Sequence, residues 1–296
     1  MKIGILKEHK FGEKRVAIVP SSVTALSKKG YEFFIESGSG DLSNYSDKNF
    51  SDAGASVVDK NSIFECDIVC KVNSPSEEEV QLLKPGTLFI SLLQTIKEID
   101  CVKSLVDKKV SAFSLNLLPR TTLAQKMDVL SSQANIAGYK AVLIASNHIG
   151  KYMPLLMTAA GTISPSKTLV IGAGVAGLQA IATAKRLGAQ VEAFDVRPEV
   201  KEQVESLGAK FVEVDSDATD GVGSGGYASE TSDEYKAKQQ ELMRERVGKS
   251  DIVITTALIP NRPAPVLIPT DMVEDMSPGS VIMDLASENG GNCELT

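Results

Sequence analysis

Three glycines at fixed spacing mark the segment of this chain with the clearest chemistry, Gly172-Ala-Gly174-Val-Ala-Gly177. A β-rich run at 168–171 precedes them, a helical pattern follows, and a second apolar run ends at Asp195, 23 residues after the first glycine. Gly172 permits a tight turn, Gly174 lets the backbone approach a diphosphate, and Gly177 lets helix and strand pack closely. The helix N-terminus offers unpaired N–H groups to that anion. This context predicts a dinucleotide-binding loop.

The acid at the end of the second strand indicates which dinucleotide is bound. We expect the Asp195 carboxylate to accept hydrogen bonds from the adenosine ribose hydroxyls. Its charge repels a 2′-phosphate, which favours NAD(H) over NADP(H). Arg197 argues the other way, but the acid occupies the decisive strand end. The alternative, a glycine-rich turn without a ligand, is disfavoured by the strand–loop–helix context.

Composition and charge disfavour several other classes of protein. A net charge of −7 argues against a nucleic-acid surface, which needs clustered Lys and Arg. The charged N-terminal segment lacks a signal-peptide core, and no run of about 18 apolar residues occurs, so we expect a soluble chain with no transmembrane segment. The four cysteines form no CxxC and only His9 and His148 accompany them, so we expect no metal site and buried free thiols.

Strand and helix patterns alternate along the whole 296-residue chain, which is long enough for about two domains. The expected strands include 2–6, 32–36, 56–58, 67–71, 168–171, 190–194, 210–212, 251–255 and 280–284; the expected helices include 21–29, 47–54, 61–65, 175–187, 198–207 and 234–247. Alternating segments also fill 80–113, and 128–149 reads as one long helix.

This order predicts an α/β fold with two Rossmann-like, doubly wound parallel-sheet domains joined by a long helix, with a cleft between them. We assign residues 1–127 to an N-terminal α/β domain and residues 128–296 to the NAD(H)-binding domain.

A polar segment with four glycines, residues 215–233, interrupts the second domain. A stretch of this length without regular structure is uncommon inside a compact domain. Two interpretations remain open. One is a solvated insertion, and the other is a mobile loop that closes over bound nucleotide with Tyr227 as its anchor.

A second segment, Pro119-Arg-Thr-Thr-Leu-Ala-Gln-Lys-Met-Asp-Val-Leu-Ser-Ser-Gln133, resembles a loop of a known enzyme family. It is similar to the Arg-Gln-Asp loop of proton-translocating NAD(P) transhydrogenase, in the α subunit that is its peripheral NAD(H)-binding component. The glycine loop with its helix, the Gly-Gly-Tyr-Ala at 225–228, and the segments 257–267 and 290–293 match that family too. The resemblance covers essentially the whole chain.

The resemblance implies direct hydride transfer from NADH on this subunit to NADP⁺ on a separate domain, coupled to proton passage through a membrane component. Such a transfer needs two nicotinamide rings about 3–3.5 Å apart and no nucleophile or metal. The implied partners are a membrane-spanning proton-channel component, an NADP(H)-binding domain and a second copy in a homodimer. The implied location is peripheral, on the cytoplasmic or mitochondrial matrix-type face of an energy-transducing membrane.

The resemblance also assigns roles within the loop. Gln125 has donors and acceptors suited to the nicotinamide ribose. Arg120 and Asp128 pair to shape the loop, or Arg120 contacts a phosphate; an ordinary surface ion pair is the alternative. These three residues form the expected catalytic set. With the glycine loop, the expected cofactor-binding residues are Arg120, Thr121, Thr122, Gln125, Leu130, Ser131, Ser132, Gly172, Gly174, Val175, Ala176, Gly177, Asp195, Val196, Arg197, Gly226, Tyr227, Gln239 and Leu258.

Alanine dehydrogenase, a sister family, supplies the main alternative. Its carboxylate-binding arginine and lysine correspond to Arg15 and Lys71, but its catalytic histidine falls at Leu93-Gln94. Glutamine cannot exchange a proton near neutral pH, so Arg15 and Lys71 are better interpreted as structural pairs. The family's catalytic aspartate aligns near Glu288. A third alternative is a non-catalytic NADH-sensing module, because family members continue past Cys293 and their tail completes the first domain.

Overall fold

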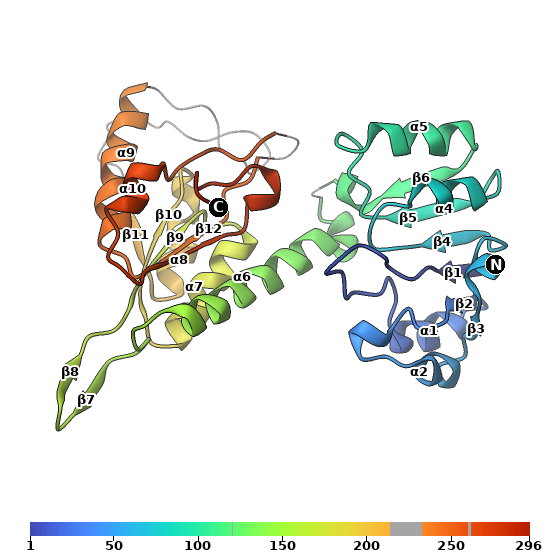
Figure 1. Ribbon diagram of the computed structural model, residues 1–296, viewed down its shortest axis with the longest axis horizontal. Helices are drawn as coiled ribbons and strands as arrows, with labels where there is room; N and C mark the ends of the chain where they lie inside the picture. Colours follow the sequence, from blue (N-terminus) through green and yellow to red (C-terminus); the bar gives the residue numbers. More distant parts are fainter. Residues whose placement is uncertain (120, 214–232, 260–261) are drawn as a thin grey trace. The chain divides into compact units, whose positions relative to one another are not determined.

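The computed structural model describes residues 1–119, 121–213, 233–259 and 262–296 (Figure 1). Its chain forms two compact units, Met1–Leu130 and Ser131–Thr296, called unit 1 and unit 2 below. Helix α6, Val129–His148, occupies the stretch where the sequence predicts a long helix. The α/β class with two parallel-sheet domains is confirmed.

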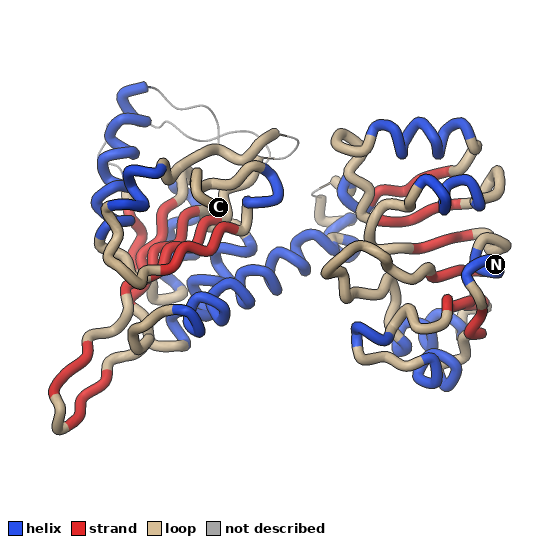
Figure 2. Tube along the Cα trace, viewed as in Figure 1, coloured by secondary structure: helices blue, strands red, loops and turns tan. Residues whose placement is uncertain are grey.

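Unit 1 is built on a six-stranded parallel sheet with the order β3-β2-β1-β4-β5-β6 (Figure 2). Its strands are β1 Lys2–Ile5, β2 Glu32–Glu36, β3 Ser56–Val58, β4 Ile68–Cys70, β5 Leu88–Ser91 and β6 Ser111–Ser114. Its helices are α1 Pro20–Ser27, α2 Asp47–Asp52, α3 Lys60–Ile63, α4 Glu77–Leu82 and α5 Ile99–Asp107. One apolar cluster, including Val23 and Phe50, lies under α1 and α2, and another, including Ile63, Val80 and Leu105, lies under α3, α4 and α5. Helices therefore cover both faces of the sheet.

Unit 2 repeats this architecture with a five-stranded parallel sheet of order β11-β10-β9-β12-β13. Its strands are β9 Lys167–Ile171, β10 Gln190–Phe194, β11 Lys210–Val212, β12 Ile252–Thr255 and β13 Val281–Asp284. Its further helices are α7 Val175–Arg186, α8 Lys201–Ser206, α9 Asp233–Gly248 and α10 Thr270–Glu274. Helices α6, α7 and α8 pack on one face of the sheet through Val142, Ile181 and Val204, and α9 and α10 on the other through Val247 and Met272.

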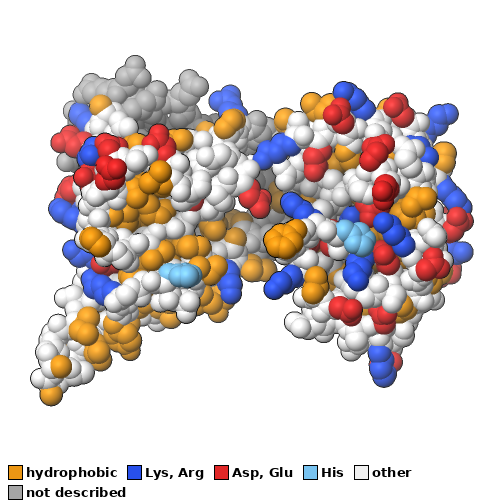
Figure 3. Space-filling view, in the orientation of Figure 1, with side chains coloured by type: hydrophobic (Ala, Val, Ile, Leu, Met, Phe, Trp, Pro, Cys, Tyr) orange, Lys and Arg blue, Asp and Glu red, His pale blue; other side chains and the backbone are white. Residues whose placement is uncertain are grey.

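A two-stranded antiparallel hairpin, β7 Leu156–Thr158 and β8 Gly161–Ile163, was not predicted from the sequence. Its strands are too short to show an alternating pattern. Hydrophobic side chains gather on the hairpin (Figure 3), where Met157 is 72% exposed. Helix α10 was also missed, because five residues give no helical period.

Each sheet has one position where the strand order reverses, between β1 and β4 in unit 1 and between β9 and β12 in unit 2. In doubly wound sheets, ligands bind outside the carboxyl ends of the strands at this position. These two crevices are therefore the places to look for a site. Across the described residues, none of the helices combines the length and apolar character needed to span a bilayer.

Candidate nucleotide site

The glycine loop lies at the strand-order reversal of unit 2, where β9 ends and α7 begins. Gly172 has a φ of 97°, a left-handed conformation that favours glycine. Its N–H donates to the carbonyl of Phe194 at 2.8 Å, and the Thr256 hydroxyl donates to its own carbonyl at 3.0 Å. A Cβ on Gly172 would lie 2.6 Å from that hydroxyl oxygen. The tight turn assigned to this glycine is therefore present.

The other two glycines serve close packing and open access. A Cβ on Gly177 would lie 1.8 Å from the carbonyl oxygen of Gly172, so no larger residue fits between α7 and the loop. Gly174 is the N-cap of α7, and no side chain caps the helix there. A Cβ on Gly174 would meet no atom within 4 Å. The N-terminus of α7 is thus open to an anion, with Val175 and Ala176 in its first turn.

Asp195 lies at the end of β10, but its carboxylate already has protein partners. Its Oδ2 accepts from the N–H of Ala173 at 2.7 Å and from the Arg197 guanidinium at 2.9 Å. Its Oδ1 accepts from the N–H of Arg197 at 2.9 Å and from its Nε at 3.0 Å. The acid is placed as predicted, while Arg197 offsets its charge. A ribose hydroxyl must therefore compete with Arg197 for the carboxylate.

The remaining predicted contacts of unit 2 surround this loop at different depths. Val196 packs against the apolar cluster under α9 and α10, and Gln239 is half-buried on α9. Leu258 follows β12 and is 43% exposed. Ser131 and Ser132 lie in the first turn of α6, half-buried and exposed respectively. Gly226, Tyr227 and the predicted lid lie outside the described residues.

In unit 1, the segment predicted to carry catalysis forms a pocket of about 270 Å³ lined by Pro119, Thr121, Thr122, Gln125 and Asp128. The segment turns back on itself, because the N–H of Gln125 donates to the carbonyl of Thr121 at 3.0 Å and the N–H of Asp128 donates to that of Gln125 at 3.3 Å. Four of the predicted residues are thus brought together.

Two predicted members of this segment need separate mention. Arg120 lies outside the described residues, so its pairing with Asp128 stays a prediction. Leu130, the last residue of unit 1, is 37% exposed.

Asn292 is a site-forming residue that the sequence analysis missed. It is fully buried. Its Oδ1 accepts from the N–H of Ala257 at 3.0 Å, and its Nδ2 donates to the carbonyls of Ala257 at 2.9 Å and Pro265 at 2.8 Å. The side chain thereby fixes the loop that carries Leu258. The partners are 35 and 27 residues away, so no local pattern indicates them.

Asp284, at the end of β13, holds the segment that contains Asn292. Its carboxylate accepts from the N–H of Asn292 at 2.7 Å and from the hydroxyls of Thr255 at 2.9 Å and Thr296 at 2.6 Å. Burial acts to raise the pKa of Asp284, but these hydroxyls and the backbone N–H donors prevail and lower it. Asp284 is therefore a charged anchor for the wall of the site.

The crevice of unit 1 is filled by the protein's own charges. Lys71, at the end of β4, pairs with Glu79 at 2.7 Å, and their side chains are 5% and 1% exposed. Arg15 pairs with Glu13 at 2.7 Å. Hydrogen bonds from Arg15 lower the pKa of Glu13 to about 2. Gln94, where alanine dehydrogenase has its histidine, is exposed. Arg15 and Lys71 are therefore held in ion pairs, as their structural interpretation requires.

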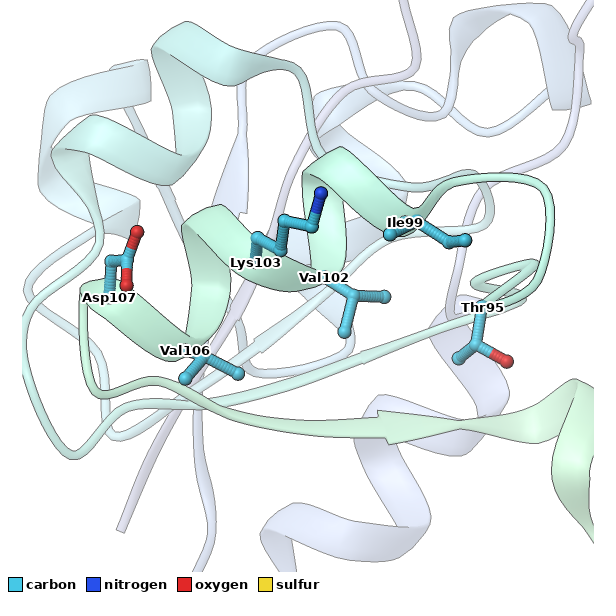
Figure 4. Close-up of a pocket in the computed structure, with 6 residues that line it drawn as sticks. All are labelled: Thr95, Ile99, Val102, Lys103, Val106 and Asp107. Carbon is cyan, nitrogen blue, oxygen red and sulfur yellow. The ribbon is translucent and has the colours of Figure 1, made fainter.

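A separate groove of about 340 Å³ lies along α5 (Figure 4). It is lined by Thr95, Ile99, Val102, Lys103, Val106 and Asp107. Its lining is mostly apolar, with no set of convergent polar groups, so it offers no chemistry of its own.

Metal and thiol chemistry receive no support from the described residues. No three His, Cys, Asp or Glu side chains gather there as a metal site would require. All four cysteines are free, with Cys66 and Cys293 buried and the other two half-buried. Burial raises the pKa of the Cys66 thiol to about 11 and that of Cys70 to about 12, which makes both poor nucleophiles.

Comparison with known proteins places these features in a family. Residues 4–137 match the model of the alanine dehydrogenase/PNT N-terminal domain, and residues 141–296 match that of the C-terminal domain. The chain is 47% identical to the first portion of the two-piece NAD(P) transhydrogenase subunit alpha of Rhodospirillum rubrum, over all of this chain and 79% of that protein. It is 48% identical to the NAD(P) transhydrogenase subunit alpha of Cereibacter sphaeroides, of which it spans only 57%.

Solved structures give the same result. A transhydrogenase from Sinorhizobium meliloti superposes with a TM-score of 0.89 at 42% identity, covering 99% of this chain and 81% of that one. An L-alanine dehydrogenase superposes with a TM-score of 0.82 at 28% identity, covering 99% and 76%. The chain therefore belongs to the alanine dehydrogenase/PNT family, as a relative of the NAD(P) transhydrogenase alpha subunit.

Proposed function

We propose that this chain is the NAD(H)-binding component of a proton-translocating NAD(P) transhydrogenase. In this role it transfers hydride between NADH and NADP⁺ bound on a partner domain. The observation that carries the proposal is the uncapped N-terminus of α7 behind Gly172, Gly174 and Gly177, with Asp195 beside it. This arrangement fits a dinucleotide, since backbone N–H groups face the diphosphate and an acid stands at the ribose end.

The bound nicotinamide would supply the hydride chemistry, and the chain's residues would bind, orient and exclude water. The pocket around Gln125, Thr121 and Thr122 offers amide and hydroxyl groups for the nicotinamide ribose. Ser131 and Ser132 are close in sequence and can bond the carboxamide. Since hydride transfer needs no acid–base group, Gln94 in the position of a histidine is consistent with this role.

The proposal extends to partners and location. The transhydrogenase relatives named above are subunits, and the one from Rhodospirillum rubrum is itself only a portion of an alpha subunit. We infer that this chain acts with an NADP(H)-binding domain and a membrane-spanning proton channel, as a homodimer on the cytoplasmic or matrix-type face of the membrane. The NAD(H) site is assigned to residues 128–296, with the Gln125 loop contributed by residues 1–127.

Amino-acid dehydrogenation is the second candidate. It is favoured by 33% identity to the alanine dehydrogenase of Staphylococcus haemolyticus, over all of this chain and 74% of that protein. Gln94 and the buried Lys71–Glu79 pair oppose it, because the first removes the proton-exchanging group and the second occupies the lysine. NAD⁺ reduction with L-alanine as substrate would establish this candidate in place of hydride exchange.

The Gln125→Asn variant tests the proposal. Shortening the side chain loosens the nicotinamide ribose while the diphosphate and adenosine contacts remain. A misplacement of about 1 Å can cost about 100-fold in rate. We therefore expect hydride transfer to an NADP-loaded partner domain to fall at least tenfold, with NADH affinity changed only a few-fold.

The measurement is stopped-flow transfer in a mixture with an isolated NADP-binding domain, with NADH affinity from fluorescence titration. Gln81→Asn, an exposed glutamine on α4, is the matched control and should behave as the parent. If Gln125→Asn transfers at the parent rate, the loop is structural and the family resemblance supports nucleotide binding alone.

A further inference from the structure

Gly138 lies in the middle of α6, where glycine disfavours helix. It is buried. A Cβ on Gly138 would lie 2.1 Å from the carbonyl oxygen of Ala176 and 2.9 Å from its carbonyl carbon. The backbones of α6 and of the first turn of α7 are therefore in direct contact. Any side chain at 138 would force the two helices about 1 Å apart, since contacts under 3.0 Å do not occur.

The contact joins two parts of the nucleotide site. Ala176 belongs to the first turn of α7, whose N–H groups face the diphosphate in the proposed complex. Ser131 and Ser132, expected at the nicotinamide end, lie about two turns from Gly138, or about 10 Å at 1.5 Å per residue. Residues 131–148 and α7 belong to the same compact unit. A shift at Gly138 is thus transmitted to the nicotinamide end.

A second bond holds the two helices in register. The Nδ2 of Asn135 donates to the Oε1 of Gln179 at 3.1 Å. Ala141 and Ala145 continue the buried face of α6 in the same apolar cluster as Ala180 and Ala184 of α7. Helix α7 is fixed to the sheet, because Gly177 contacts the Gly172 carbonyl. When the α6–α7 distance increases, α6 therefore moves and the diphosphate loop stays.

We propose that Gly138 is a positioning residue that sets the distance between the diphosphate-binding and nicotinamide-binding ends of the site. This inference rests on the proposed function. Its consequence is selective, since displacing α6 disturbs the nicotinamide end and leaves the adenosine and diphosphate contacts in place. Alanine is a better helix former than glycine, so Gly138→Ala cannot act by weakening the helix itself.

The test compares Gly138→Ala with the parent in binding ADP and NADH, with ADP as the probe of the adenosine and diphosphate end. We expect ADP affinity within twofold of the parent, NADH affinity about tenfold lower, and an altered emission maximum for bound NADH. Hydride transfer to an NADP-loaded domain should fall by about 100-fold. Asn147→Ala, an exposed change on the same helix, is the control and should leave all three unchanged.

Asn135→Ala is the second variant, which covers a failure of Gly138→Ala to fold. It removes the bond to Gln179 without a clash and should lower NADH affinity about threefold with ADP unchanged. Equal losses for ADP and NADH, or parent-like NADH affinity and transfer in both variants, would overturn the inference. A parent chain that binds ADP and NADH but transfers no hydride would instead overturn the proposed function and leave the binding comparison valid.

Discussion

The two units use one topology and nearly one loop geometry for different ends. In unit 2 the carboxylate after β10, Asp195, accepts from the N–H of Ala173 at 2.7 Å. In unit 1 the carboxylate at the end of β2, Glu36, accepts from the N–H of Lys7, also at 2.7 Å. Both N–H groups lie two residues beyond the first strand of their sheet. An acid at this strand end therefore fixes the loop, whether or not a nucleotide binds.

What differs is the segment that follows the first strand. In unit 2, residues 172–174 lead at once into α7, whose N-terminus stays uncapped by side chains. In unit 1, residues 6–19 separate β1 from α1, and Glu8 in this segment accepts from the N–H of Val72 at 2.5 Å and from Asn73 Nδ2 at 2.9 Å. The crevice of unit 1 is satisfied by its own carboxylates, whereas that of unit 2 leaves backbone donors for a ligand.

The largest expected effect breaks the charge-filled crevice of unit 1. Lys71→Met would leave the buried Glu79 with only the more distant Lys60, at 3.6 Å. Removing one partner of a buried pair costs about 3 kcal/mol of unfolding free energy. Urea unfolding should show this loss, while ADP binding to the folded protein is unchanged.

Lys71→Met combined with Glu79→Gln is the control, since it removes the buried charge and should recover part of the stability. A loss of ADP affinity in Lys71→Met would mean that the two crevices are not independent.

The next effect removes the feature that unit 2 alone possesses. In Gly177→Ala, the new Cβ would meet the Gly172 carbonyl at 1.8 Å, so α7 must move away from the loop. Losing two charge-assisted bonds to the diphosphate, at about 1.5 kcal/mol each, lowers affinity by about 100-fold. Isothermal titration with ADP measures it. Gly150→Ala, where a Cβ meets nothing within 4 Å, is the matched control, and equal affinities in the two variants would contradict the role of Gly177.

The sequence predicted those parts of the fold that depend on local pattern. The strand at 32–36 and the loop at 172–177 were predicted at the positions where they are found, because apolar periodicity and glycine spacing are read along the chain. The β7–β8 hairpin was missed because its strands have three residues each. At the candidate site, the hydrogen bonds of Asn292 join residues far apart in sequence, so they required the fold.

Gly138 and Arg197 show a finer limit. The sequence contains a signal for Gly138, a single glycine within a long helical pattern, but its partner at Ala176 is visible only in three dimensions. The sequence likewise places Arg197 two residues from Asp195 and leaves open whether it favours NADP(H) or pairs with the acid. The structure shows the pair.

Asp195→Ala sharpens the comparison between the two strand-end acids. If Asp195 selects the cofactor, its loss should weaken NADH binding and narrow the gap to NADPH, by about tenfold, since about 1.4 kcal/mol separates the two ligands for each factor of ten. Fluorescence titration with both cofactors measures this ratio. Glu36→Ala, the equivalent change in unit 1, should lower stability and leave the ratio unchanged. A constant ratio in Asp195→Ala would give Asp195 the same purely structural role as Glu36.

The smallest expected effect concerns pH and the charges of unit 1. Hydrogen bonds from Arg15 lower the pKa of Glu13 from 4.5 to about 2. A carboxyl with a lowered folded-state pKa adds stability that is full above pH 4.5 and is lost as the pH falls through about 2. Because solvent screens some of this interaction, we expect Glu13→Gln to cost only about 1 kcal/mol at pH 7.

The cost of Glu13→Gln relative to the parent should shrink steadily below pH 4.5 in urea unfolding. Asp100→Asn, an acid of α5 whose side chain is 98% exposed, is the control, and its cost should be near zero throughout. NADH affinity in Glu13→Gln should match the parent at every pH, because the charges of unit 1 serve its own crevice. A pH-independent cost would instead mean that Glu13 acts through the shape of its loop, with Asn73 and Arg15 as neutral packing partners.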